Sequence, residues 1–186
     1  MTLIIYGPVS TDKRGFIDFW ALRYKGFDEE FYDANVGREL TESRVLALFV
    51  WKNGKPLSAR KSESVFRNFI SRRGELVQLS PDESASDLLV RFSEGGAIFR
   101  IFWLHCWRPE LFPIYDQHVH RAMRFIEAGV REEIPGNDAQ KIRSYLDNYL
   151  PFHAGFDGIA WRQVDKALWA FGKFLNENNF PTEVPQ

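Results

Sequence analysis

The chain has 186 residues, of which 45% are hydrophobic and 26% are charged, with a formal net charge of −1 and a pI near 6.4. This length supports one substantial core or two small lobes, and the near-neutral charge counts against a strongly electrostatic nucleic-acid binder. A single cysteine, Cys106, excludes an intrachain disulfide and a four-cysteine iron–sulfur cluster. No apolar run approaches the roughly 20 residues that span a bilayer. The start of the sequence lacks a basic leader, so we expect a cytoplasmic protein without a membrane partner.

Beyond a short strand expected at residues 3–6, nearly every periodic segment favours helix. The sequence therefore predicts an all-α protein with about eight helices. In chain order they are expected at residues 16–24, 42–51, 62–72, 81–92, 97–107, 117–128, 138–149 and 157–175.

Capping residues mark the ends of several expected helices. Thr41 is a favourable N-cap for the second helix, and Gly54 is a favourable residue to end it. Ser80 followed by Pro81 indicates the start of the fourth helix, because proline fits the first helical position. Pro151 is expected to end the seventh helix.

An aspartate, a histidine and an arginine are closely spaced where the sixth helix begins, at Asp116, His118 and Arg121. This run resembles the D-x-H-[VI]-x-R signature of the helix-hairpin-helix DNA glycosylases, the HhH-GPD superfamily. About twenty residues upstream, Gly95 and Gly96 separate two apolar helical runs, as the DNA-binding hairpin does in that family.

The resemblance covers roughly residues 41–173. It implies a two-lobed helical HhH-GPD-like fold with a central cleft, assigned to residues 41–186. Residues 1–40 have no counterpart in the family, and we expect them to form an N-terminal extension packed on the core.

In the family, the aspartate at the position of Asp116 is catalytic, stabilising an oxocarbenium-like sugar or activating water. Aspartate is also a favoured N-cap, so a purely structural role for Asp116 stays open. His118 and Arg121 are expected to support the helix rather than react. A metal site formed by Asp116, His118 and His120 is disfavoured, because positions i and i+2 of a helix diverge by about 200°. We therefore expect no metal or other cofactor.

The hairpin departs from the family pattern at Glu94, which stands where the family has a glycine that lies against a phosphate. Gly95 and Gly96 are expected to bind DNA through their amides, or else to form an ordinary turn between helices. Bifunctional family members carry a nucleophilic lysine at the position of Ile98, and no lysine occurs between Lys61 and Lys141. The resemblance therefore implies a monofunctional enzyme.

Further DNA contacts are expected from a helix end and from a basic cluster. Lys52 and Asn53 lie where family members fill the gap left by a flipped base, although Lys52 also suits the end of a helix dipole. The basic cluster, which includes the DNA-binding candidates Arg72 and Arg73, consists of Arg60, Lys61, Arg67, Arg72 and Arg73.

Aromatic residues are abundant, and they can fill a core or line a base pocket. The residues expected to line such a pocket are Trp51, Trp103, Trp107 and Tyr115, with Trp161 and Trp169 as further candidates for a stacking wall. Gly172, within the last expected helix, indicates close packing against a neighbour.

These features together favour a monofunctional DNA N-glycosylase that flips a damaged or modified base out of double-stranded DNA, with Asp116 as the catalytic residue. The alternative is a non-catalytic descendant of the glycosylase fold that binds nucleic acid or protein through the same cleft. The sequence identifies neither the base nor a protein partner.

Overall fold

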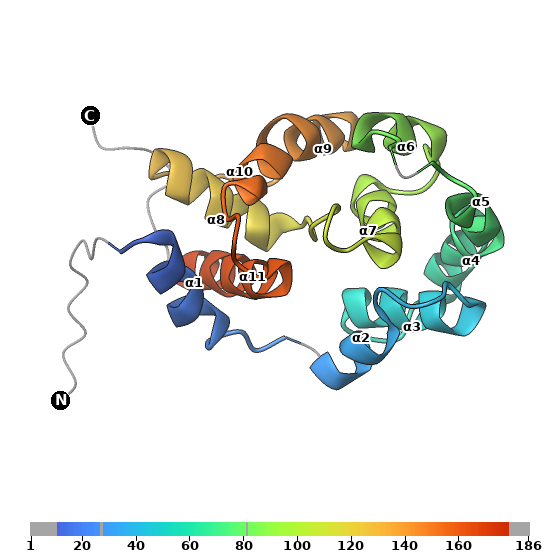
Figure 1. The fold of residues 1–186 in the computed structure, drawn as a ribbon, viewed down its shortest axis with the longest axis horizontal. Helices are drawn as coiled ribbons and strands as arrows, with labels where there is room; N and C mark the ends of the chain where they lie inside the picture. Colours follow the sequence, from blue (N-terminus) through green and yellow to red (C-terminus); the bar gives the residue numbers. More distant parts are fainter. Residues whose placement is uncertain (1–10, 27, 81, 179–186) are drawn as a thin grey trace.

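The computed structural model describes residues 11–26, 28–80 and 82–178. Within these residues all regular secondary structure is helical, which confirms the all-α prediction (Figure 1). The strand expected at residues 3–6 lies outside the described residues.

Eleven α-helices and two short helical turns of other types are found in the described part of the chain. The first group is α1 (Lys13–Ala21), α2 (Glu29–Asn35), α3 (Glu42–Asn53), α4 (Ala59–Asn68), η1 (Ile70–Arg72), α5 (Arg73–Val77) and α6 (Ala85–Arg91). The second group is α7 (Ala97–Trp107), α8 (Gln117–Ala128), α9 (Asp138–Ser144), η2 (Tyr145–Tyr149), α10 (Leu150–Ala154) and α11 (Trp161–Glu177).

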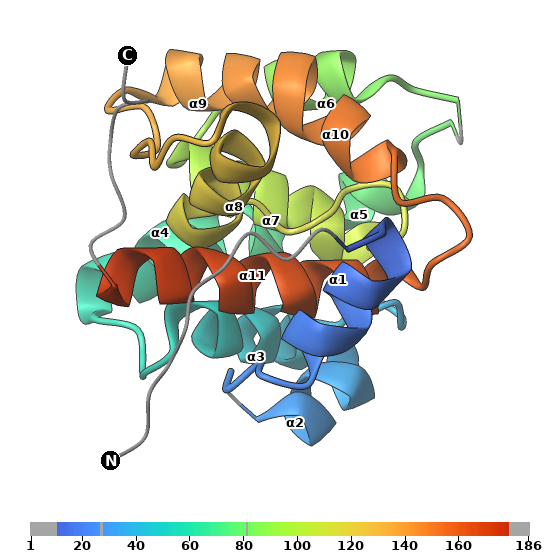
Figure 2. The ribbon, with the colours of Figure 1, turned by 90° about the vertical axis from the view of Figure 1, so that its left-hand side faces the viewer.

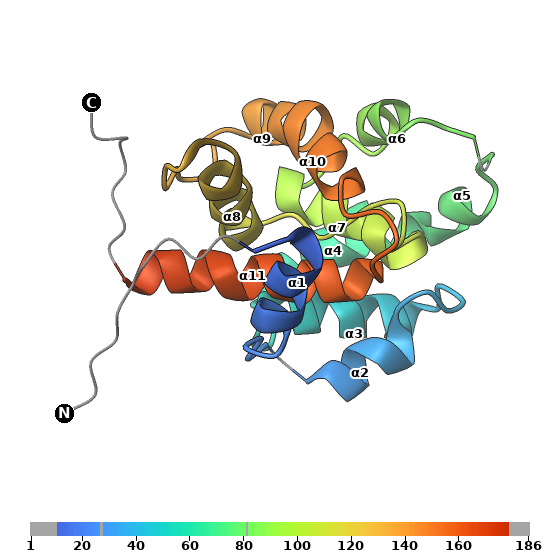
Figure 3. The same ribbon diagram turned by 60° about the vertical axis from the view of Figure 1, so that its left-hand side comes forward.

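Helix α11 runs between two groups of helices, with α2 and α3 on one side and α8, α9 and α10 on the other (Figure 2). Helix α1 lies along α11 (Figures 2 and 3). Helix α7 is central in Figure 1, and most of its side chains are buried. Aromatic rings fill much of the core, which includes Tyr32, Phe49, Phe69, Phe102, Trp103, Tyr145 and Tyr149.

The described residues before Thr41 lie against the rest of the chain. Helix α1 contributes Ile17 to the core and α2 contributes Tyr32, with 1% and 0% of their surfaces exposed. Both belong to the same continuous core as the later helices. The division into an extension and a domain at residue 40 stays a prediction.

The backbones of α8 and α11 pack closely against each other where Gly172 meets His118. A Cβ atom added to Gly172 would lie 1.8 Å from the His118 carbonyl oxygen, far inside any van der Waals contact. The close packing predicted at Gly172 is therefore confirmed. This contact fixes the start of α8, and with it Asp116, relative to α11.

Several predicted helix bounds are wrong. The helix expected at residues 16–24 spans Lys13–Ala21, the helix expected at residues 157–175 begins at Trp161, and α2 was not predicted.

Two further boundaries are wrong, each for a local reason. Helix α6 begins at Ala85, because the Ser84 hydroxyl accepts a hydrogen bond from the Asp87 amide at 3.1 Å and caps the helix there, after Ser80. Pro151 does not end a helix. The chain forms the π-type turn η2 and continues into α10, where proline fits the first turn because its missing N–H needs no partner.

The segment expected to be one helix over residues 62–72 is interrupted. Helix α4 begins after Ser58, whose hydroxyl caps it, and ends at Phe69, where φ is −128° and ψ is −60°. The side chain of Phe69 is fully buried. Packing of this ring against the core therefore outweighs the helical periodicity of the sequence.

Candidate functional site

Asp116 lies at the start of α8 and is bound on both sides of its carboxylate. Its Oδ1 atom accepts hydrogen bonds from the amides of His118 and Val119, at 2.9 and 3.3 Å, so the expected helix cap is confirmed. Its Oδ2 atom accepts a hydrogen bond from Lys52 Nζ at 2.7 Å. The carboxylate therefore joins the start of α8 to the end of α3.

Lys52 reaches Asp116 because of how α3 is placed and ended. Thr41 caps the start of α3, and Gly54, with φ of 70°, ends the helix two residues after Lys52; both ends are as predicted. The Lys52 and Asp116 side chains are only 9% and 17% exposed. Water therefore screens this ion pair less than it screens a surface pair.

The surroundings of Asp116 favour the ionised form of its carboxyl group. Burial alone would raise the pKa of this carboxyl, but the charges of Lys52 and His118 and the hydrogen bonds of its oxygens lower it below the ordinary value. A carboxylate that stays ionised inside a protein can stabilise a developing positive charge. Asp116 can therefore act electrostatically on a bound cationic group.

A small cavity of about 50 Å³ lies beside this pair. Its buried floor includes Trp51, Ile114, Val119 and Asp165, and its partly exposed rim includes Tyr24, Lys52, Asp116, Arg162 and Trp169. A cavity of about 150 Å³ accommodates a benzene ring. A nucleobase therefore needs the rim side chains to move before it can occupy this space.

Asp165 is the least expected member of this cavity. It is 2% exposed, and neither carboxylate oxygen has a hydrogen-bond partner of good geometry in the described part of the chain, although the Ile114 amide lies close enough to lower the pKa of this carboxyl. Burial raises its pKa to about 7, although Arg162 and Lys52 act in the opposite direction. Such an unsatisfied buried acceptor is costly, and this is typical of a functional position.

Sequence reasoning missed Tyr24, Arg162 and Asp165. Asp165 and Arg162 lie on the same face of α11, with Trp169 one turn further, at spacings of three and four residues. Polar residues on an otherwise apolar helix face were the available signal. Tyr24 had no such signal, because it follows α1 in a segment without a recognised motif.

Among the four aromatic residues predicted to line a base pocket, Trp51 lines the cavity and the other three do not. Trp103 is fully buried in the core, and the ring of Trp107 stacks on Phe112 with 6.3 Å between centroids. Helix α7 is buried on most sides, so its aromatic residues fill the core rather than a pocket. Of the four predicted pocket residues, the structure thus brings Trp51 to this cavity and places the other three elsewhere.

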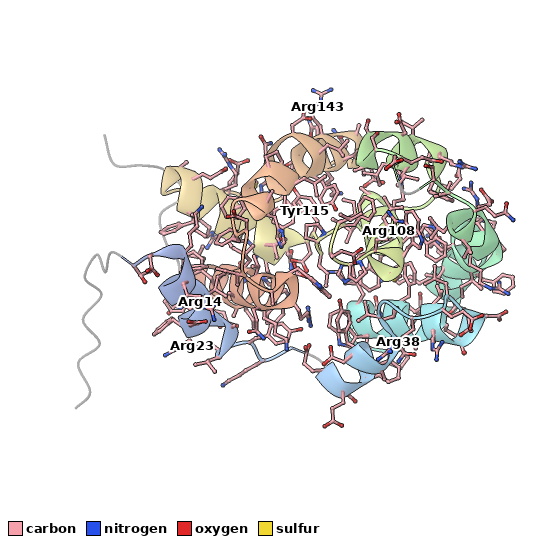
Figure 4. All side chains as sticks on the ribbon, in the orientation of Figure 1. Arg14, Arg23, Arg38, Arg108, Tyr115 and Arg143 are labelled. Carbon is pink, nitrogen blue, oxygen red and sulfur yellow. The ribbon has the colours of Figure 1, made fainter. Side chains whose placement is uncertain are left out.

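Tyr115 also lies away from the cavity, inside the helical core (Figure 4). Its hydroxyl donates to Ser144 Oγ and lies 2.9 Å from His120 Nδ1. The candidate stacking residues divide in the same way. Trp169 is on the cavity rim, whereas Trp161 contacts His105 in the interior.

His118 and Arg121 make contacts around the first turns of α8. The His118 ring meets Trp169 edge-on, with 5.1 Å between centroids. Arg121 is 4% exposed, and its guanidinium donates to both carboxylate oxygens of Glu133 and to His118 Nδ1. These contacts connect α8 to the loop that follows it and to the cavity rim.

The two residues of the predicted wedge are separated by the structure. Lys52 points to Asp116, whereas Asn53 stabilises its own turn. The Asn53 Oδ1 atom accepts from Lys61 Nζ at 2.7 Å, and its Nδ2 atom donates to the Lys55 carbonyl at 2.8 Å. Lys52 is therefore a cavity residue, and Asn53 already has intramolecular partners.

The α6–α7 connection is a tight turn that needs glycine. Gly95 has φ of 84°, and Gly96 is the N-cap of α7 without a side-chain hydrogen bond. Arg100 donates hydrogen bonds to the carbonyls of Phe92 and Leu89 at the end of α6. Hydrogen bonds within the protein thus hold the turn in place, and its conformation does not require a bound phosphate.

Arg72 and Arg73, predicted to bind DNA, have partners within the protein. Arg72 forms two hydrogen bonds of 2.8 Å with Glu75 and lies 4.7 Å from the centre of the Phe92 ring. Arg73 donates to the Ile70 carbonyl at 2.9 Å. Any phosphate contact by Arg72 competes with its ion pair.

In residues 11–26, 28–80 and 82–178, no group of three or more His, Cys, Asp or Glu side chains is arranged to hold a metal ion. No helix within the same ranges is both long and apolar enough to cross a membrane. No protein family, curated protein or solved structure matches the chain.

Proposed function

We propose that this protein is a DNA N-glycosylase with a two-lobed, HhH-GPD-like arrangement, in which the cavity beside Asp116 receives an extruded nucleotide. The observation that carries the proposal is the pair of Asp116 and Lys52, which combines an ionised carboxylate with an amine at 2.7 Å on the rim of one cavity. Glycosidic cleavage develops positive charge on the sugar, and an ionised carboxylate stabilises that charge.

Lys52 changes the expected route of the reaction. The monofunctional prediction rests on Ile98 at the family's lysine position, but the nucleophilic amine can come from another helix. In this proposal the C1′–N bond breaks and the base leaves with the bonding electrons, while the ionised Asp116 carboxylate stabilises the sugar cation. A proton of the Lys52 ammonium passes to the leaving base, and the neutral amine attacks C1′ of the sugar.

The covalent product then has two outcomes. The amine adduct loses a proton, the sugar ring opens at O4′, and C1′ becomes a protonated imine with Lys52. Water hydrolyses this imine and releases the lysine, or elimination of the 3′ phosphate cleaves the strand first. The route needs no oxidant or metal, because every transferred group is a proton, a base or water.

Borohydride trapping on duplex DNA that carries a panel of modified bases tests this proposal. Wild-type protein should release a base and form a trapped adduct. Lys52→Arg keeps the positive charge beside Asp116 but cannot form an imine, so it should lose the adduct. Lys61→Arg is the matched control, because Lys61 lies on α4 and contacts Asn53, and it should trap normally.

Each other result has a definite meaning. Base release by the wild type without a trapped adduct, retained in Lys52→Arg, would establish the water route and a monofunctional enzyme. Absence of base release from every duplex in the panel would refute the catalytic proposal.

The alternative function is a non-catalytic module that binds nucleic acid or protein through the same cleft. It is favoured by the net charge of −1 and by Glu94 in the α6–α7 turn. It is also favoured by the internal ion pair of Arg72. DNA binding without base release, unchanged in Asp116→Asn, would support this alternative.

A further inference from the structure

The cavity contains buried hydrogen-bonding groups that no group in residues 11–26, 28–80 and 82–178 satisfies. Both Asp165 oxygens, Arg162 Nε and Trp51 Nε1 are buried and without hydrogen-bond partners in the described part of the chain. All three residues line the same cavity as Asp116 and Lys52. Buried polar atoms are usually paired, so an unpaired group of this kind indicates a missing ligand or bound water.

The exposed and buried positions of the cavity residues define how a bound nucleotide would be oriented. Asp116 and Lys52 are on the partly exposed rim, whereas Asp165 and Trp51 are on the buried floor. A sugar at the rim therefore directs its base toward Asp165. The Tyr24 ring meets Trp169 edge-on at 5.1 Å between centroids, on the rim of the cavity.

The types of the unpaired atoms define which base fits. The carboxylate of Asp165 offers two acceptors, whereas Arg162 Nε and Trp51 Nε1 offer one donor each. The guanine edge carries the O6 acceptor beside two adjacent N–H donors, N1–H and N2–H. Adenine and cytosine present a single amino donor beside a ring acceptor, and uracil presents one N–H between two acceptors.

We infer that Asp165 and Arg162 form a specificity subsite for a guanine-type base, with Asp165 accepting from two adjacent N–H groups and Arg162 donating to the neighbouring carbonyl oxygen. The inference rests on the proposed function, because it uses Asp116 and Lys52 to place the sugar. Charge favours this pairing, since hydrogen bonds to an ionised carboxylate are about twice as strong as neutral ones.

His153 is a positioning residue behind this subsite. Its Nε2 atom lies 3.7 Å from Asp165 Oδ1 and has no hydrogen-bond partner among the described residues. The side chain is 11% exposed and does not line the cavity. His153 thus restricts the Asp165 carboxylate on the side away from the ligand.

Nucleoside binding tests the subsite independently of catalysis. Trp51 and Trp169 border the cavity, so quenching of tryptophan fluorescence reports its occupancy. Guanosine should bind at least tenfold more tightly than adenosine, cytidine or uridine at about pH 8. In Asp165→Asn the preference should fall by about tenfold to a hundredfold, because an amide offers one acceptor instead of two and carries no charge. The matched control is Asp157→Asn, which lies on the exposed loop before α11.

The outcomes separate this subsite from the proposed function. Selective guanosine binding that Asp165→Asn loses and Asp157→Asn retains supports the subsite, even if no duplex substrate is cleaved. Equal binding of the four nucleosides, no binding of any, or a preference unchanged in Asp165→Asn overturns it, even if Lys52 forms a trapped adduct. Circular dichroism of both variants establishes that each is folded.

Discussion

Asp165→Asn should make the protein more stable at neutral pH, and the gain should depend on pH. The folded state raises the pKa of Asp165 from an ordinary 3.8 to about 7, so the native carboxyl binds its proton more tightly than the unfolded one. Between about pH 4 and pH 7 the unfolded chain releases this proton first, and the wild type loses stability as the pH rises. Asparagine does not titrate and avoids this loss.

The size of this effect on the free energy of unfolding follows from the pKa shift of Asp165. About three pKa units at 1.36 kcal/mol each give an upper limit of about 4 kcal/mol, complete above about pH 7 and absent below about pH 4. The charged and titratable groups near Asp165 include Arg162, Lys52, Asp116 and His153, together with the buried tyrosines Tyr32, Tyr145 and Tyr149. Burial lowers the pKa of His153 to about 4, and this makes stability rise with pH between about pH 4 and pH 6.5.

Urea unfolding of the wild type and Asp165→Asn at several pH values between about 4.5 and 8 measures this effect. Since both proteins contain His153, the difference between their unfolding free energies isolates Asp165. That difference should be small at the acidic end and should favour the variant by a few kcal/mol at about pH 8. A difference that is the same at every pH would refute a raised pKa for Asp165.

Three further changes test other parts of the structure. Gly172→Ala should lower the free energy of unfolding by about 3 kcal/mol, because its methyl group overlaps the His118 carbonyl; an unchanged melting temperature would show that α8 and α11 can separate freely. Asp116→Asn should abolish base release and cost about 1–3 kcal/mol, since Lys52 loses its counter-charge while the amide still caps α8; base release at the wild-type rate would remove Asp116 from the mechanism. Glu94→Gly should tighten DNA binding without changing base preference, and an unchanged affinity in a salt titration would exclude the α6–α7 turn as a phosphate contact.

Local rules predicted the parts of the fold that depend on neighbouring residues. Thr41 and Asp116 cap their helices through amides two or three residues away, and Gly54 ends α3 with a positive φ. Such contacts depend on short-range backbone geometry, which the sequence pattern specifies directly. The bounds of α7 and α8 were predicted correctly for the same reason.

The composition of the cavity was not predictable in this way. Lys52 and Asp116 are 64 residues apart, and their contact depends on how α3 and α8 pack. Asp165 lies on α11, and its role depends on an environment that periodicity does not specify. For the aromatic residues of α7 the residue type was misleading. Trp103 is of a type that lines base pockets, but it is enclosed in the core.

The backbone contact between Gly172 and His118 fixes the spacing of two helices, whereas the side chains that line the cavity can vary. The spacing of α8 and α11 is set by main-chain atoms, so it does not depend on which side chains line the cavity. Substitutions at Tyr24, Arg162 or Trp169 can reshape the cavity while Asp116 keeps its place. The same scaffold can thus accept new cavity shapes by single substitutions, and it offers an engineer a frame in which the cavity is redesigned without moving Asp116.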